Sequence, residues 1–331
     1  MRVPINELFL KHETHLAGVI NKVSVRENRS LSYDKVRLHV SDLMKTDTAF
    51  AFCERQHVIQ KLFRPKIIAS SLSASFDLLF DLGNALHDNA RRRWMTNDQH
   101  GPQRVLARWH CPCKTTWHTG VNPFGQPECP RCRFQPTVFD EHEIYDEELA
   151  IVAHPDFTIV KGMDVIETGK FDKAKHKVHV VEIKGIDRAD VNWNTLDAPL
   201  GEHMLQGSFY YHLYVRAGYK VDKNISFLYG ERSLKETLFR GEPWKEFTRE
   251  ASSMTRLQPF FDKATNVVNC VNESRVPERV LCNAVDCTRA KNCPVANLCF
   301  EINKNGYKKT PQKKKRIVLK NSKHAQRPIR V

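Results

Sequence analysis

Two carboxylates, an imidazole and a lysine occur along this chain in an order that suits metal-dependent hydrolysis of a phosphodiester. They belong to His87, Asp156, Glu182 and Lys184. Mg²⁺ prefers hard oxygen ligands, and a bound cation neutralises the charge that develops on phosphorus when water attacks. A neighbouring lysine can orient or deprotonate that water and offset the charge of the transition state. We therefore expect His87, Asp156 and Glu182 to bind Mg²⁺ or Mn²⁺ beside Lys184.

The segment Val178–Lys184 is the strongest strand candidate, because β-branched residues dominate it. Successive side chains of a strand point to opposite faces. Glu182 and Lys184 should therefore lie on the same face, with Ile183 packed into the core behind them.

A second strand is expected at residues 156–160, and the charged segment 172–177 reads as a turn. Together they predict a hairpin-like pair of strands that brings Asp156 next to the Glu-x-Lys strand. Asp164 and Asp172 are rival metal ligands. We rank them lower, because Asp172 lies in the turn and Asp164 does not stand at the entry to a strand.

Two helices are expected to supply the remaining polar groups. Apolar residues at a spacing of three and four predict a helix over Phe76–Trp94, with His87 adjacent to its buried face. A second helix over Glu202–Val215 places Gln206 and Tyr210 one turn apart on the same side.

Less specific patterns predict the rest of the chain. Ser41 looks like the N-cap of a helix that ends near Pro65. A strand is expected at Ile225–Tyr229, and a long amphipathic helix at Trp244–Val271.

The order and spacing of these residues resemble the RecB-type branch of the PD-(D/E)XK nucleases. Three segments carry the resemblance, together with the Glu182-Ile183-Lys184 strand: Leu82-Gly83-Asn84-Ala85-Leu86-His87, Ala153-His154-Pro155-Asp156 and Gln206-Gly207-Ser208-Phe209-Tyr210. The resemblance implies an α/β fold with a restriction-endonuclease-like core, in which helices flank a mixed central sheet. Ala153 replaces the glycine of the family, and a gap of 26 residues between Asp156 and Glu182 is a second, mild departure.

The resemblance also implies roles for individual residues. In the family the histidine that corresponds to His87 reaches the metal, and the Gln-x3-Tyr pair contacts DNA or positions the lysine. The implied catalytic set is Asp156, Glu182, Lys184, Gln206 and Tyr210.

Four cysteines predict a zinc ribbon, inserted in the core at residues 108–136: Cys111, Cys113, Cys129 and Cys132. Two cysteine pairs separated by a loop suit tetrahedral zinc. The first pair has one residue between its cysteines where two is usual, so His110 or His118 could replace one of them. A closed four-ligand site leaves no position for water, which favours a structural or DNA-docking role.

A second cysteine set lies at residues 277–303, with one distant member upstream. It resembles the iron–sulfur branch of the RecB-type nucleases, found in AddB and in the CRISPR adaptation nucleases, where a [4Fe–4S] cluster joins the two ends of the nuclease domain. The implied ligands are Cys53, Cys287, Cys293 and Cys299, with Cys282 as the alternative to Cys287. Zinc or free thiols remain open at these positions. Cys270 stands apart and is expected to be a buried residue of a helix.

Positive charge is concentrated at the end of the chain. The net charge is +14, and ten of the 52 lysines and arginines fall in residues 308–331, which contain no acidic residue. Such a segment should be solvated and attract polyanions. We expect DNA contacts from Lys313, Lys314, Lys315 and Arg316, although a solubilising tail or a localisation signal would have the same composition.

These patterns predict a nuclease domain over residues 1–303 and a basic, disordered tail over 304–331. No apolar run of 18 residues and no secretory signal occur, so we expect no membrane association and an intracellular protein, in the cytoplasm, at the nucleoid, or in a host cytoplasm if a virus encodes it.

The expected function is a Mg²⁺- or Mn²⁺-dependent deoxyribonuclease, an exonuclease acting on DNA ends or single strands in replication, recombination or repair. The alternatives are a non-catalytic DNA-binding or recombination scaffold, and a structure-specific endonuclease of the same fold. The sequence contains no P-loop for nucleotide-driven unwinding. A helicase or recombination protein is therefore a possible partner besides DNA.

Overall fold

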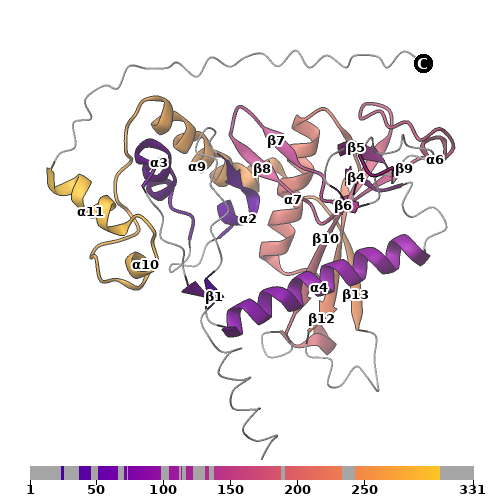
Figure 1. Cartoon of the computed structure of the whole chain (residues 1–331), viewed down its shortest axis with the longest axis horizontal. Coiled ribbons are helices and arrows are strands. Elements are labelled where there is room, and N and C mark those ends of the chain that lie inside the picture. Colours follow the sequence, from indigo (N-terminus) through magenta and orange to yellow (C-terminus); the bar gives the residue numbers. More distant parts are fainter. Residues whose placement is uncertain are drawn as a thin grey trace, which may run out of the picture.

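The computed structural model (Figure 1) describes residues 24–25, 37–45, 51–65, 71–72, 74–97, 104–111, 113, 117–121, 131–133, 138–187, 191–232 and 243–305. Cys129 and the basic residues of the tail, including Lys313, Lys314, Lys315 and Arg316, lie outside this part of the chain.

The structure mixes helices with several small sheets. Its helices include α2 (Val40–Leu43), α3 (Glu54–Phe63), α4 (Ala74–Asn97), α6 (Met163–Thr168), the 3-10 turn η1 (Trp193–Thr195), α7 (Gly201–Arg216), α9 (Met254–Asn272), α10 (Thr288–Lys291) and α11 (Ala296–Asn305). Its strands include β1 (Ser24–Val25), β2 (Leu38–His39), β3 (Ser71–Leu72), β4 (Leu106–His110), β5 (Trp117–Val121), β6 (Val138–Asp140), β7 (Ile144–Asp146), β8 (Ile151–Ala153), β9 (Phe157–Lys161), β10 (Lys177–Ile186), β11 (Lys220–Val221), β12 (Asn224–Glu231) and β13 (Trp244–Glu250).

The largest sheet is built around β10. Strand β9 pairs with it in antiparallel orientation, β11 and β12 pair with it in parallel, and β13 forms the edge beyond β12. Phe157 lies opposite Val181 in the β9–β10 register. Asp156, which directly precedes β9, therefore stands beside Glu182, as the expected pairing required. Helix α6 occupies part of the connection before the charged turn.

Three smaller sheets accompany it. Strand β8 lies between β2 and β7 and leads directly into the segment that carries Asp156. Strand β4 lies between β5 and β6, and β1 pairs with β3. A fold of mixed α and β elements, as expected for the α/β class, is therefore present.

Helix α7 packs closely on the sheet because Gly207 lacks a side chain. A Cβ at this position would lie 2.9 Å from the Phe227 ring of β12 and 3.1 Å from Ile225. On the same helix, Phe209 stacks on Phe261 of α9 at 4.4 Å between ring centroids. These contacts hold the same turn of α7, which also carries Gln206 and Tyr210, against the sheet.

Helix α4 approaches the opposite end of β12 at a second close contact. A Cβ on Gly230 would meet the Leu86 side chain at 2.7 Å. His87 follows Leu86 directly, so this contact fixes where the expected histidine enters the site. The helix spans the predicted range Phe76–Trp94 and extends it at both ends.

Two helical predictions were wrong. The single helix from Ser41 to Pro65 is broken into α2 and α3, and α2 starts at Val40 without a side-chain cap. The predicted helix over Trp244–Val271 is strand β13 followed by α9, because residues 244–250 pair with β12 along their full length.

The two cysteine-bearing regions lie far apart in Figure 1. Helices α3, α9, α10 and α11 are at the left of α7, and the β5–β4–β6 sheet is at its right, beside β9. Cys270 is fully buried on α9, as predicted. None of the helices in the described residues is long and apolar enough to cross a membrane.

Candidate active site and metal centres

Asp156 is the centre of a polar cluster at the start of β9. Its Oδ1 lies 3.0 Å from Nδ1 of His87 on α4. Its Oδ2 accepts a hydrogen bond of 2.8 Å from the backbone NH of Ile183 on β10. The carboxylate thus joins the helix and the two strands that the sequence predicted would meet, and it is 7% exposed.

Glu182 and Lys184 point to the same side of β10, as the two-residue period requires. The Lys184 ammonium forms an ion pair with Oε1 of Glu182. Glu182 is 1% exposed, and its Oε2 is a buried oxygen that has no hydrogen-bond partner among the described residues. An unpartnered carboxylate oxygen in the interior is costly unless a cation or a proton binds it.

The pKa values of the acidic groups are spread widely. Burial, and then the charge of Asp156, raise the pKa of Glu182 to about 8 despite its bond to Lys184. Burial also acts to raise the pKa of Asp156, but its hydrogen bond with His87 and the charge of Lys184 lower it overall. The cluster therefore holds more acidic groups than it can ionise without a further cation, a condition typical of metal and catalytic sites.

Lys184 is a cation at neutral pH. Burial acts to lower its pKa, but Glu182 and Asp156 raise it overall. A lysine with a raised pKa is a poor base and a good hydrogen-bond donor. Of the two roles considered for it, orienting water fits better than deprotonating it.

The three expected metal ligands meet only in part. His87 contacts Asp156, and Asp156 lies beside Glu182, but the three do not bring their ligand atoms within 4.8 Å of one another. Each carboxylate is engaged by a cationic or imidazole side chain, Glu182 by Lys184 and Asp156 by His87.

Gln206 and Tyr210 face this cluster from α7. Nε2 of Gln206 donates a hydrogen bond of 2.7 Å to the Tyr210 hydroxyl, which confirms that the two share one side of the helix. Tyr210 is 4% exposed, and burial, with the charges of Glu182 and Asp156, raises its pKa well above the ordinary value.

Two residues next to Lys184 were not predicted as site residues. Tyr229 lies opposite Lys184 in the β10–β12 register, and Nδ1 of His203 lies 2.8 Å from the Tyr229 hydroxyl. Burial lowers the pKa of His203 to about 4, so it is neutral at pH 7. Tyr229 lies within the strand predicted by its apolar residues, and no motif singles it out.

Two further residues of the cluster were also missed. Arg91 lies one helical turn after His87 on α4, and its Nη2 is 3.5 Å from Oδ1 of Asp156 and bonded to Glu141. Burial, and then Asp156, raise the pKa of Glu141 to about 7. The spacing of four from His87 could have indicated Arg91, whereas Glu141 follows the cysteine-rich segment with no motif around it.

The rival acidic residues lie elsewhere. Asp164 is on α6, where its Oδ2 accepts from Lys175 at 2.6 Å and lies 3.0 Å from Nε2 of His176. Asp172 is in the turn before β10, where it accepts bonds from nearby backbone NH groups. His154, two residues before Asp156, is turned to Glu143, at 3.6 Å between Nε2 and Oε2.

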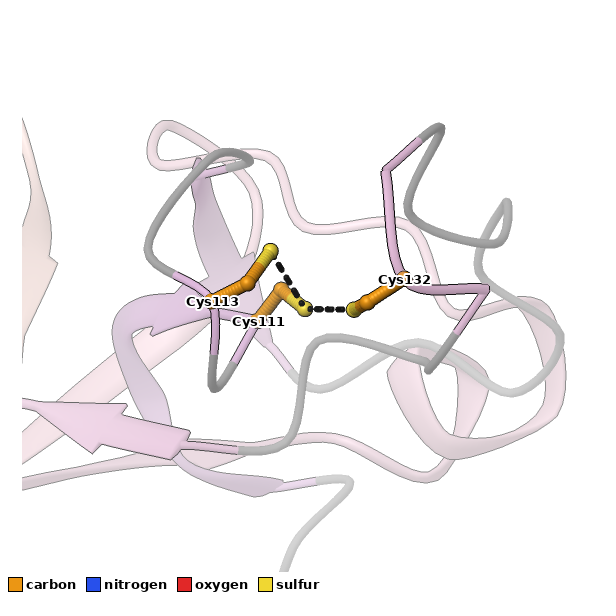
Figure 2. A group of neighbouring side chains, drawn as sticks. All are labelled: Cys111, Cys113 and Cys132. Carbon is orange, nitrogen blue, oxygen red and sulfur yellow. Dashed lines mark hydrogen bonds between the residues drawn. The ribbon is translucent and has the colours of Figure 1, made fainter.

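Three of the four predicted zinc ligands converge beyond the end of β4. Figure 2 shows the thiols of Cys111, Cys113 and Cys132 directed at one another. Sγ of Cys111 lies 2.9 Å from Sγ of Cys132 and 3.3 Å from Sγ of Cys113. All three thiol sulfurs lie within 4.8 Å of one another, and two thiolates on one tetrahedral zinc lie about 3.8 Å apart when the Zn–S bonds are about 2.3 Å. A metal such as zinc could bind here.

Of the two histidines expected as substitute ligands, His110 is not part of this group. Nδ1 of His110 lies 3.1 Å from the backbone oxygen of Cys111, and His110 is not among the converging ligands of the described residues. The side chain of His118 and the fourth cysteine, Cys129, lie outside the described residues.

The second cysteine set surrounds a cavity of about 660 Å³ between α3 and the C-terminal segment. Four cysteines line it: Cys53, Cys282, Cys293 and Cys299. Cys287 is not part of the lining, but its thiol is hydrogen-bonded to that of Cys282, and it accepts a bond from the Ala290 NH at 3.4 Å. The alternative ligand, Cys282, therefore lines the cavity, and Cys287 lies directly beside it.

Arg55 connects the two ends of the chain at this cavity. It lies on α3 with 5% exposure. Its guanidinium donates 3.0 Å hydrogen bonds to Sγ and to the backbone oxygen of Cys299, and a further bond to the Pro277 oxygen. A buried guanidinium beside thiols suits a group that carries negative charge.

No known protein-family model matches this chain, and no curated protein is significantly similar to it in sequence.

Proposed function

We propose that this protein is a Mg²⁺- or Mn²⁺-dependent deoxyribonuclease with a RecB-type PD-(D/E)XK core. The observation that supports it most is the buried Oε2 of Glu182, which lacks a hydrogen-bond partner among the described residues and lies beside Asp156 and Lys184. The two carboxylates supply the oxygen donors that such cations prefer.

Each residue has a role in this proposal. Asp156, Glu182 and His87 hold the cation, which supplies charge neutralisation at the scissile phosphate. Lys184, kept protonated by the two carboxylates, donates a hydrogen bond to the attacking water and offsets charge in the transition state. Tyr210, held by Gln206, adds a donor that stays protonated at neutral pH.

The cysteines are proposed to hold structural metals. Cys111, Cys113 and Cys132, with Cys129, suit zinc. For the cavity, a [4Fe–4S] cluster on Cys53, Cys282, Cys293 and Cys299 is proposed, because four cysteines line one space beside the buried Arg55. Either group would join segments distant in sequence without taking part in hydrolysis.

DNA is the proposed substrate, and the basic tail is proposed to add affinity through the phosphates. We propose action on DNA ends or single strands in replication, recombination or repair, inside the cell, with any unwinding left to a helicase or recombination protein. A structure-specific endonuclease, or a DNA-binding scaffold without activity, would use the same surfaces.

One experiment separates these functions. End-labelled linear DNA and covalently closed circular DNA are incubated with the protein, with and without Mg²⁺ or Mn²⁺. Release of nucleotides from linear DNA alone indicates an exonuclease, and linearisation of the circle indicates an endonuclease. Binding without cleavage under every cation would leave the scaffold function and refute the nuclease proposal.

A further inference from the structure

Glu141 reaches the acidic cluster from the cysteine-bearing sheet. It is the first residue after β6, whose register with β4 pairs Asp140 with Arg108 and Phe139 with Trp109. An ion pair between Arg108 and Asp140 adds to this pairing. The position of Glu141 is therefore set by the same two strands that lead toward the converging thiols.

Arg91 lies between Glu141 and Asp156. Its Nη2 is bonded to Oε1 of Glu141 and lies 3.5 Å from Oδ1 of Asp156. Its Nε donates a hydrogen bond of 3.1 Å to the backbone oxygen of Asp156. The Arg91 side chain is 12% exposed. Its guanidinium contacts both the main chain and the carboxylate of Asp156, and the planar guanidinium with its several N–H donors suits such a two-point contact.

Aromatic rings extend this contact into the cysteine-bearing sheet. The Arg91 guanidinium lies over the Phe139 ring at 5.2 Å. Phe139 packs edge-on against Trp109, at 5.8 Å between ring centroids, and lies tilted against Phe157 at 5.9 Å. Phe157 directly follows Asp156. A β-bridge between Val105 and Ile159 also joins the start of β4 to β9, so this sheet is built onto the strand that carries Asp156.

We propose that Arg91 and Glu141 are positioning residues of the acidic site, and that the cysteine-bearing sheet holds them in place: β6 carries Glu141 to Arg91, and Arg91 orients Asp156 for a cation shared with Glu182. This inference rests on the proposed nuclease function. Partners of this kind, bonded to a ligand without touching the metal, commonly change metal affinity by about 10–100-fold when they are removed.

The first test compares Glu141→Gln with Glu143→Gln. Glu143 is two residues away and equally polar, but it contacts Arg37 at 2.7 Å and His154 instead of Arg91. Mn²⁺ binding is measured by electron paramagnetic resonance of the free ion, and turnover is measured as a function of Mn²⁺. We expect Glu141→Gln to bind Mn²⁺ about 10-fold more weakly, with turnover at saturating Mn²⁺ near that of the wild type, and Glu143→Gln to match the wild type.

Arg91→Lys is the second variant, since it keeps the positive charge but loses the planar guanidinium that makes two contacts at once. It should weaken Mn²⁺ binding in the same way, and the double variant should be no weaker than the single ones, because the two residues act as a unit. Melting curves exclude global unfolding as the cause.

A Mn²⁺ affinity of Glu141→Gln within twofold of the wild type would overturn the inference and leave the nuclease proposal standing. So would lost turnover at saturating Mn²⁺ with unchanged affinity. A wild-type protein that neither binds Mn²⁺ nor cleaves DNA would refute both.

The positioning role of the cysteine-bearing sheet is tested separately. Cys132→Ser should lower the zinc content and shift Mn²⁺ affinity in the same direction as Glu141→Gln, with no further loss when the two are combined. Zinc loss with intact Mn²⁺ affinity would overturn the part of the inference that assigns the sheet a positioning role.

Discussion

Replacing Glu182 by glutamine should flatten the dependence of stability on pH in protein without divalent cations. Folding raises the pKa of this carboxyl from 4.5 to about 8, chiefly through burial and the charge of Asp156. Between these values the folded chain binds a proton that the unfolded chain has released. The contribution of Glu182 to stability is therefore highest at low pH and falls as the pH rises through this range.

The size of the effect follows from the shift. At about 1.36 kcal/mol per unit, the rise from 4.5 to about 8 corresponds to a loss of up to about 5 kcal/mol over the whole titration, of which about 3.5 kcal/mol falls between pH 5 and pH 8. Glu141, raised to about 7 by burial and Asp156, adds a loss in the same direction. Since Glu182→Gln also deprives Lys184 of its partner, the slope with pH, and not the stability at one pH, is the quantity to compare.

Urea unfolding monitored by circular dichroism at pH 5, 6, 7 and 8 measures this slope, with Glu143→Gln as the control glutamate. The wild type and the control should lose stability toward pH 8, and Glu182→Gln should lose much less. Adding Mn²⁺ at about 100 times its dissociation constant should restore about 2.7 kcal/mol to the wild type at pH 8. An identical slope in the wild type and Glu182→Gln would refute the assignment of a buried carboxyl with a raised pKa at this position.

Three further predictions concern the other parts of the chain. Lys184→Ala should lower cleavage by about 100–1,000-fold, with DNA binding and the melting transition retained; wild-type turnover in this variant would contradict its role. Elemental analysis should find about four irons and one zinc per chain, and Cys53→Ser and Cys282→Ser should lose iron more completely than Cys287→Ser, because the first two line the cavity. The opposite order would restore Cys287 as the ligand. Deleting residues 308–331 should reduce the log-salt slope of DNA binding, by at most about nine, while cleavage at saturating DNA persists; an unchanged slope would exclude tethering by the tail.

The elements that carry the acidic site could be predicted because local pattern and burial agree in them. Strand β10 is rich in valine, and Glu182 and Lys184 fall on one side of it by alternation alone. Helix α7 was expected within one residue at each end. Strand β10 is buried on both faces, so its β-branched residues mark it as a strand, and α7 carries a cluster of buried residues on a helix of sixteen residues. In both cases the signal is contained in a short window.

The wrong prediction for β13 and the site residues that were not predicted both depend on contacts between distant segments. Strand β13 is an edge strand with few buried side chains, and Trp244 and Phe247 are spaced as on a helix, so only pairing with β12 decides its conformation. Glu141 and Arg91 meet through the docking of the β4–β6 sheet on β9. Nothing within the neighbouring residues of either side chain specifies that contact.

The separation in sequence across the cysteine cavity imposes an order on the synthesis of the protein. Arg55 and Cys299, which bond to each other, are 244 residues apart. At about 5–20 residues per second, α3 emerges from the ribosome roughly 12–50 s before its partner. During that interval Ile59, which packs against Val295 and Ile302 in the finished protein, lacks these neighbours. A chain that stops before Cys299 cannot close the cavity, so occupancy of these cysteines would report that translation had reached α11.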